Sequence, residues 1–178
     1  MKHQLPIVTH PKNPSLHERC RDVRKNELST NDTKQFIRDM IHTMYKDVGV
    51  GIAAPQVGKN IRLAIIAKGA LKKTDEPVPF STRKDLVIIN PTYVPLNTEK
   101  EGGEEGCLSV PGVWGMALRH TKIHVRFDTP EGAPCKLVAT GFLARVFQHE
   151  IDHLNGILFT DHARDVWEAE KKPKYPMI

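Results

Sequence analysis

The apolar residues between Ser29 and Gly49 recur every three or four positions. They are Phe36, Ile37, Met40, Ile41, Met44, Tyr45 and Val48. This spacing places apolar side chains on one face of a helix. Ser29, Thr30 or Asn31 can cap the first turn, and Gly49 can end the last one. The pattern therefore predicts an amphipathic helix over this segment.

Apolar runs and turn-forming segments alternate after this helix. Residues 61–67 are rich in β-branched side chains and predict a buried strand. A polar loop with prolines is expected over residues 68–85, followed by a short strand over 86–90 that Pro91 ends. Residues 97–105 are acidic and contain glycines, which predicts a second loop.

A β-hairpin is predicted in the second half of the chain. Ile123, Val125 and Phe127 alternate with polar residues, as expected for a strand with one buried face. The segment 129–132, Thr-Pro-Glu-Gly, has the composition of a turn. Residues 135–139 then supply the returning strand.

A second helix is predicted from Gly141 to the Asn155–Gly156 pair, with a short final strand over residues 157–160. Its broad apolar surface consists of Phe142, Leu143, Val146, Phe147, Ile151 and Leu154. Strands that come in runs, with one central helix among them, differ from a regular βαβ alternation. The expected fold class is α+β, with mostly antiparallel strands around a central helix.

This second helix carries a His-Glu-x-x-His motif. His149 and His153 stand four residues apart, so they project from one helix face and can bind one metal ion. Glu150 lies too far around the helix to be the natural third ligand, but it can take a proton from the water that a metal activates. The motif therefore predicts metal-assisted hydrolysis, against the alternative of two core histidines satisfied by hydrogen bonds. Since Phe142 and Val146 share the histidine face, the metal is expected in the interior.

Length and composition limit the remaining choices. The 178 residues fit one domain, residues 1–178, large enough to bury a core without a structural metal. No apolar run approaches the roughly 18 residues of a membrane span, and no signal or transit segment is recognisable. Three widely spaced cysteines favour a reducing cytosol over a disulfide framework. The net charge of +5 permits contact with RNA, although a solvated surface explains it equally well.

The helix supplies only two of the three protein ligands that a catalytic zinc-type site requires. Asp161, His162 and Asp165 come after it, but none matches the extended spacings of metalloproteases. Upstream, residues 105–109 read Glu-Gly-Cys-Leu-Ser, and a metal would hold the thiol of Cys107 as a thiolate. This segment is a second possible source of a third ligand.

Another distinctive segment, residues 49–56, reads Gly-Val-Gly-Ile-Ala-Ala-Pro-Gln. It fits the loose dinucleotide pattern G-x-G-x-x-A. That pattern requires a strand before it and a helix after it, whereas here a helix precedes the segment and Pro55 interrupts any helix after it. A nucleotide site is therefore not expected.

Together the three segments resemble the peptide deformylase family, hydrolases that remove the formyl group from the N-terminal formylmethionine of new proteins. The resemblance extends from about Leu16 to His162. It implies that Cys107, His149 and His153 bind one divalent metal ion per chain. Fe(II) is favoured in the cell by the resemblance, and Zn, Ni or Co suit the same ligands.

The resemblance also assigns roles to residues around the metal. Glu150 would act as acid and base, while Gln56 and the backbone N–H of Leu108 would hold the oxyanion. Glu105 and Arg119 would pair and orient the ligands, although a surface ion pair is equally compatible with the sequence. Substrate would bind as an added β-strand, with an apolar pocket for the methionine side chain. The residues expected to contact substrate are Val50, Gly51, Gly106, Phe142, Arg145 and Val146.

The expected partners are N-formylmethionyl peptides and nascent chains, in the cytoplasm, with an organellar mature form left open. A transient ribosome contact is considered, but the tail after His162 is short and broken by prolines, unlike the long basic helix of some bacterial members. No DNA or membrane partner is expected.

Two rival functions remain open. One is a zinc endopeptidase in which Cys107 is structural, and the other is a non-catalytic metal-binding module. The lack of a clear fourth ligand near either motif argues against the second rival.

Overall fold

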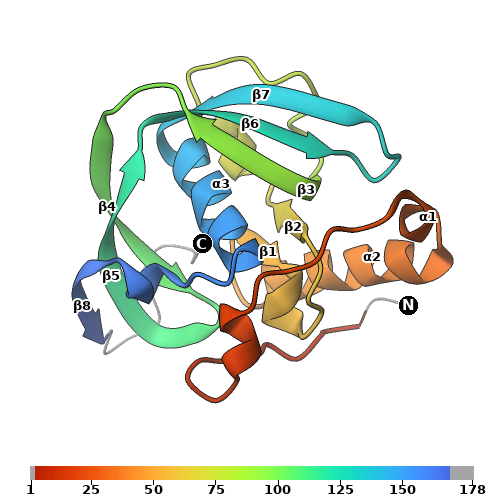
Figure 1. Cartoon of the computed structure of the whole chain (residues 1–178), viewed down its shortest axis with the longest axis horizontal. Coiled ribbons are helices and arrows are strands. Elements are labelled where there is room, and N and C mark those ends of the chain that lie inside the picture. Colours follow the sequence, from red (N-terminus) through yellow and green to blue (C-terminus); the bar gives the residue numbers. More distant parts are fainter. Residues whose placement is uncertain (1–2, 169–178) are drawn as a thin grey trace.

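The computed structural model describes residues 3–168, and its strands form two sheets around the helix α3 (Gly141–Leu154) (Figure 1). The five-stranded sheet has the order β1-β2-β3-β6-β7, and the three-stranded sheet the order β4-β5-β8. Every pairing between these strands is antiparallel, which confirms the predicted α+β class. The strands are β1 Gly51–Ala53, β2 Leu63–Ile66, β3 Leu86–Pro95, β4 Lys100–Cys107, β5 Val110–His120, β6 Lys122–Asp128, β7 Pro134–Thr140 and β8 Arg164–Glu168.

The predicted first helix is α2 (Asn31–Lys46). Its N-cap is Thr30, whose hydroxyl accepts a hydrogen bond from the backbone N–H of Thr33 at 3.2 Å. The backbone N–H of Gly49 then bonds to the carbonyl of Met44 at 2.8 Å and turns the chain toward β1. The shorter helices are α1 Lys25–Leu28, η1 Pro14–His17, η2 Ala54–Val57, η3 Ala70–Lys72 and η4 Phe159–Asp161.

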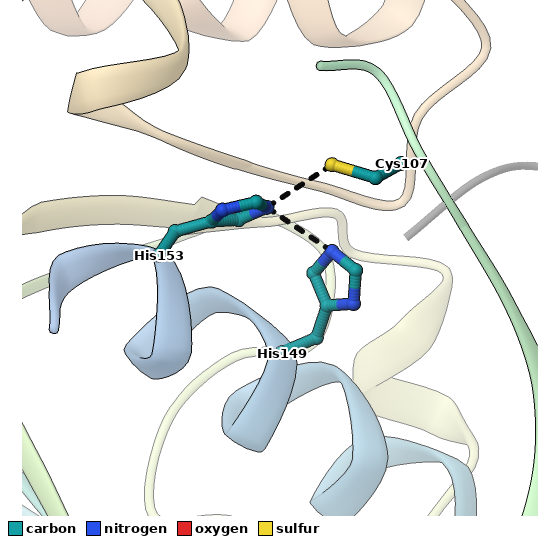
Figure 2. A group of neighbouring side chains, drawn as sticks. All are labelled: Cys107, His149 and His153. Atoms are coloured by element: carbon teal, nitrogen blue, oxygen red, sulfur yellow. Dashed lines mark hydrogen bonds between the residues drawn. The ribbon is translucent and has the colours of Figure 1, made fainter. Parts of the chain in front are cut away.

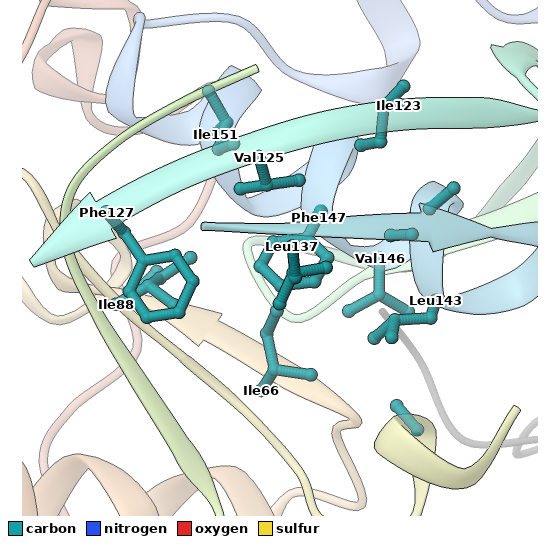
Figure 3. Packing of buried hydrophobic residues seen from close by; sticks show 14 of the residues in the cluster. Ile66, Ile88, Ile123, Val125, Phe127, Leu137, Leu143, Val146, Phe147 and Ile151 are labelled. Atoms are coloured by element: carbon teal, nitrogen blue, oxygen red, sulfur yellow. The ribbon is translucent and has the colours of Figure 1, made fainter. Parts of the chain in front are cut away.

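The second predicted helix, α3 (Gly141–Leu154), and the β6–β7 hairpin are also confirmed. Nearly all of α3 is buried, because the five-stranded sheet covers its apolar face (Figure 3). The aromatic rings of Phe147 on α3 and Phe127 on β6 lie 6.4 Å apart between their centroids. Burial of this cluster fixes the helix that carries the metal motif.

The predicted end of the strand over residues 86–90 and the predicted loop over residues 97–105 are both wrong. The strand that begins at Leu86 continues through Pro91 to Pro95, because Asn90 adopts a positive φ of 50° and the pairing register shifts there. A proline without an N–H is tolerated at such an irregularity. The segment expected as an acidic loop is β4 from Lys100 onward, paired along its length with β5, a strand that the sequence pattern did not predict.

The strand expected over residues 157–160 is also wrong. This segment contains the 3-10 turn η4, and the backbone N–H of Leu158 donates to the carboxylate of Asp161 at 2.8 Å. That bond turns the chain before a strand can form. The final described strand is β8, which pairs with β5. The basic tail at residues 171–174, and with it the ribosome expectation, lies outside the described residues.

Candidate active site

Three side chains from two separate elements meet in the interior beside α3 (Figure 2). His149 and His153 project from α3, and Cys107 is the last residue of β4. The Sγ of Cys107 lies 3.2 Å from Nε2 of His153, which lies 3.2 Å from Nε2 of His149. All three ligand atoms lie within 4.8 Å of one another, so one ion with bonds of about 2.0–2.3 Å can reach them all.

The chemistry of this site fits a divalent cation. Burial raises the pKa of the Cys107 thiol to about 12, and the neighbouring Glu150 charge adds to that effect, so this thiol requires a bound cation to hold it as a thiolate. Burial also lowers the pKa of His153 well below its ordinary value, which keeps the imidazole neutral and able to ligate. Within residues 3–168 these are the only three grouped residues of ligand type, so a fourth position is left for water.

Glu150 is fully buried beside these ligands. Neither of its carboxylate oxygens has a hydrogen-bond partner among the described residues. Burial raises the pKa of this carboxyl well above its usual range, and the charge of Glu105 raises it further. A buried carboxyl without partners is costly, and such groups occur mostly at functional sites. Glu150 is therefore suited to accept and return a proton.

Gln56 reaches the site from η2. Its Oε1 accepts a hydrogen bond from the backbone N–H of Ala53 at 2.8 Å, which fixes the orientation of the amide. Its Nε2 then donates toward the sulfur of Cys107 at 3.3 Å. Leu108 comes directly after Cys107 at the end of β4 and is also buried. The structure thus brings both expected oxyanion donors next to the same cysteine.

The predicted ion pair of Glu105 and Arg119 lies in the interior rather than on the surface. Arg119 donates two hydrogen bonds to the Glu105 carboxylate, at 2.9 and 2.8 Å. Nδ1 of His149 lies 2.9 Å from the same carboxylate, so the second nitrogen of a candidate ligand is held in place. Arg119 also pairs with Asp152, a buried acid that the sequence pattern did not single out although it directly precedes His153.

The residues expected at the substrate are not all brought together. Val146 lies wholly inside the core cluster, and half-buried Phe142 lies under the ammonium of Lys73 at 4.8 Å. The guanidinium of Arg145 faces Glu105 at 2.9 Å. A cavity of about 200 Å³ touches Phe142 and Arg145 but not Val146. The apolar pocket assembled from these three residues remains a prediction.

Two larger cavities border the segment that leads into β1, and one of them is lined by Val50, an expected substrate residue. One of about 730 Å³ is lined by Leu108, Pro111 and Val48 together with the N-terminal segment. The second, of about 570 Å³, is lined by Val48, Val50 and the start of the loop after β2. Val48, which is 64% exposed, borders both cavities. Open space therefore lies on both sides of the chain that leads into β1.

Comparison with known proteins identifies the family of this chain. The family model described as polypeptide deformylase matches residues 4–168. The chain belongs to the peptide deformylase family. A peptide deformylase from Desulforudis audaxviator is 39% identical over 165 residues, which cover 93% of this chain and 97% of that protein. The family assignment decides against the zinc endopeptidase and the non-catalytic module.

Solved structures of deformylases agree with this assignment. A class I type b peptide deformylase from Acinetobacter baumannii, with Met-Ala-Ser bound, matches with a TM-score of 0.79 and 36% identity, over 91% of this chain and 99% of that one. The deformylase from Thermotoga maritima matches with a TM-score of 0.78 and 34% identity, over 92% and 99% of the two chains. No helix within residues 3–168 has the length and apolarity needed to cross a bilayer.

Proposed function

We propose that this chain hydrolyses the N-formyl amide of formylmethionyl peptides at the site formed by Cys107, His149 and His153. One observation carries the proposal: the Cys107 sulfur and the two Nε2 atoms converge beside a buried carboxylate, Glu150, that has no partner of its own among the described residues. This arrangement combines candidate metal ligands with a proton acceptor in one buried site. Membership of the deformylase family supports this choice of reaction.

Cys107, His149 and His153 would hold the metal ion. When bound, it supplies a Lewis acid that polarises the formyl oxygen and lowers the pKa of water from about 15.7 toward about 7. A set of one thiolate and two imidazoles suits Fe(II), Zn(II), Co(II) and Ni(II). We assign Fe(II) as the ion used in the cell.

Glu150 performs the proton transfers. It takes a proton from the attacking water as the water oxygen bonds to the formyl carbon, and it returns that proton to the methionine nitrogen as the C–N bond breaks. The products are formate and a peptide with a free amine. Negative charge on the former carbonyl oxygen is met by Nε2 of Gln56 and the backbone N–H of Leu108.

The peptide would bind in an extended form. Val50 directly precedes β1, Gly51 is the first residue of β1, and Gly106 lies in β4 next to Cys107. Because β1 and β4 are each an edge strand of their sheet, a peptide strand can be added beside them. The Met-Ala-Ser bound to the Acinetobacter baumannii deformylase supports a peptide occupant. Its methionine side chain would enter the predicted apolar pocket, which is walled by Phe142, Val146 and the apolar stem of Arg145. We further propose nascent chains at the ribosome, in the cytoplasm, as the natural substrates.

The proposal is tested with three peptides that differ only at the N-terminus. Formyl-Met-Ala-Ser, acetyl-Met-Ala-Ser and unblocked Met-Ala-Ser are incubated with metal-loaded protein and with the same protein after chelation. We expect formate and a new amine from the formyl peptide alone, and none after chelation, since a tight cavity admits a formyl group and excludes the extra methyl of acetyl. Equal processing of the acetyl peptide contradicts the size argument, and cleavage within Met-Ala-Ser contradicts deformylation.

A further inference from the structure

Arg145 and His149 bind opposite oxygens of one carboxylate. They stand one helical turn apart on α3 and face Glu105 on β4. Nη1 of Arg145 donates to Oε1 of Glu105 at 2.9 Å, and Nδ1 of His149 lies 2.9 Å from Oε2. Residues four positions apart on a helix point in the same direction, so both contacts arise from one helix face.

The Glu105 carboxylate uses all of its acceptor capacity. Oε1 accepts from Arg119 and Arg145, and Oε2 from Arg119 and His149. An ionised carboxylate offers about four acceptor positions, so each of these contacts limits where the carboxylate can move. Glu105 is fully buried, and an unpaired charge there would be costly. Two arginines, Arg119 and Arg145, compensate the negative charge of Glu105.

Arg145 also holds the backbone of the β4–β5 pair. Nη1 donates to the carbonyl of Ala117 at 2.8 Å, and Nη2 donates to the carbonyl of Glu101 at 2.8 Å. The guanidinium lies so close to Gly103 that a Cβ there would come within 2.6 Å of its central carbon. One side chain of α3 therefore connects the helix to both strands.

We propose that Arg145 is a positioning residue for the metal site. The site has two halves, Cys107 on β4 and the two histidines on α3, and Arg145 joins the two elements while fixing Glu105 against His149. Its guanidinium contributes to the affinity and geometry of the metal, not to peptide binding. This inference rests on the proposed metal site and adds a residue to it.

The competing assignment places Arg145 against the substrate. The side chain of Arg145 is only 10% exposed, and its two terminal nitrogens already donate to Glu105, Ala117 and Glu101. A contact between the guanidinium and the substrate would therefore need these bonds to break, whereas the apolar stem of Arg145, expected to line the methionine pocket, would not. The two assignments predict different measurements, because a positioning residue changes metal affinity and turnover while a substrate residue changes KM.

The test compares Arg145→Met with Arg145→Lys and with Arg62→Met. Arg62 is a matched control because it is also buried and donates to backbone carbonyls, of Leu154 and Pro91, but does not touch Glu105. Each protein is prepared without metal and loaded with Co(II). The dissociation constant is measured by competition with a chromophoric chelator, and the absorption spectrum of the Co(II) form is recorded before kcat and KM are determined.

Arg145→Met is expected to raise the Co(II) dissociation constant by about 10- to 100-fold, shift the cobalt bands, and lower kcat with KM nearly unchanged. Arg145→Lys should restore part of the affinity, and Arg62→Met should keep the wild-type constant and spectrum. A wild-type constant and spectrum in Arg145→Met overturn the inference, and a raised KM with unchanged metal affinity assigns Arg145 to substrate.

Two further results separate the possible causes of failure. If Arg145→Met does not fold, Co(II) binding by Gly103→Ala tests the inference instead, because the added methyl group displaces the guanidinium of Arg145 without removing it. Weakened Co(II) binding in Gly103→Ala supports the inference, and wild-type binding overturns it. If the wild-type protein itself shows no cobalt bands from a sulfur ligand, the proposed metal site fails, an outcome distinct from the failure of Arg145 as a positioning residue.

Discussion

The carboxylate of Glu150 lies against the backbone of Gly51, so close that a Cβ at residue 51 would sit 2.1 Å from Oε1. This contact joins the His-Glu-x-x-His helix to the start of β1. Only a residue without a side chain leaves room for the carboxylate in this position. Residue 51 must therefore be glycine because of the proposed acid–base group Glu150. Neither a turn nor a positive φ angle requires glycine at this position.

Gly51→Ala should lower turnover by roughly 10²-fold, since the methyl group displaces a catalytic carboxylate by a distance that matters for proton transfer. The three atoms nearest to this methyl group all belong to Glu150, so metal content should remain. Gly69→Ala is the matched control, because no atom lies within 4 Å of a Cβ at residue 69. Wild-type turnover in Gly51→Ala, with metal bound, would show that Glu150 does not need its observed position.

Gln56→Leu should lower kcat more than it raises KM. The substitution removes the Nε2 donor that points toward Cys107, and loss of one oxyanion donor typically costs about 10²- to 10³-fold in kcat. Steady-state kinetics with formyl-Met-Ala-Ser at equal metal content provide the measurement. An unchanged kcat with a raised KM would assign Gln56 to substrate recognition.

Glu105→Gln should destabilise the metal-free protein most strongly near neutral pH. Burial raises the pKa of Glu105, but hydrogen bonds from Arg119 and His149 outweigh it and hold that pKa far below its ordinary value of 4.5. A lowered folded-state pKa contributes stability above the unfolded value, and this stability is lost as the pH falls through the folded value.

Removing one partner of a buried pair typically costs about 3–5 kcal/mol, so a loss of this order is expected at pH 7. The difference in unfolding free energy between wild type and Glu105→Gln should then shrink below about pH 4.5. Denaturant titrations at pH 7 and at about pH 2.5, which lies well below the unfolded pKa, measure it. A difference that is constant across this range would show that the charge of Glu105 contributes nothing to stability.

Local sequence patterns predicted the helices and the β6–β7 hairpin because their apolar periodicity matches the core that they enter. β4 escaped prediction for a physical reason. Its glycines have low strand propensity, yet Gly103 is where the Arg145 guanidinium packs, and Gly106 leaves room for the ring of Trp114, 2.9 Å from a Cβ at that residue. Tertiary contacts, not local preference, decide this strand.

Part of the candidate site could likewise be predicted from local sequence, and part depends on tertiary contacts. The candidate ligands are visible in the sequence because His149 and His153 stand four residues apart on one helix and Cys107 lies in a short recognisable segment. The environment of Arg145 is not visible, because its partner Glu105 lies 40 residues away along the chain and on another element. The residue was expected at the substrate, and only the fold reveals that its guanidinium faces inward.

The most direct test of the proposed mechanism is the turnover of Glu150→Gln at full metal occupancy. The amide keeps the size of the side chain but cannot accept the proton. Formate release from formyl-Met-Ala-Ser should fall by roughly 10²-fold or more, with metal content and unfolding midpoint retained. Glu104→Gln, an exposed change on β4, is the control for loss of one charge and should keep wild-type turnover. Near-normal formate release by metal-loaded Glu150→Gln would contradict the proposed role of this carboxylate.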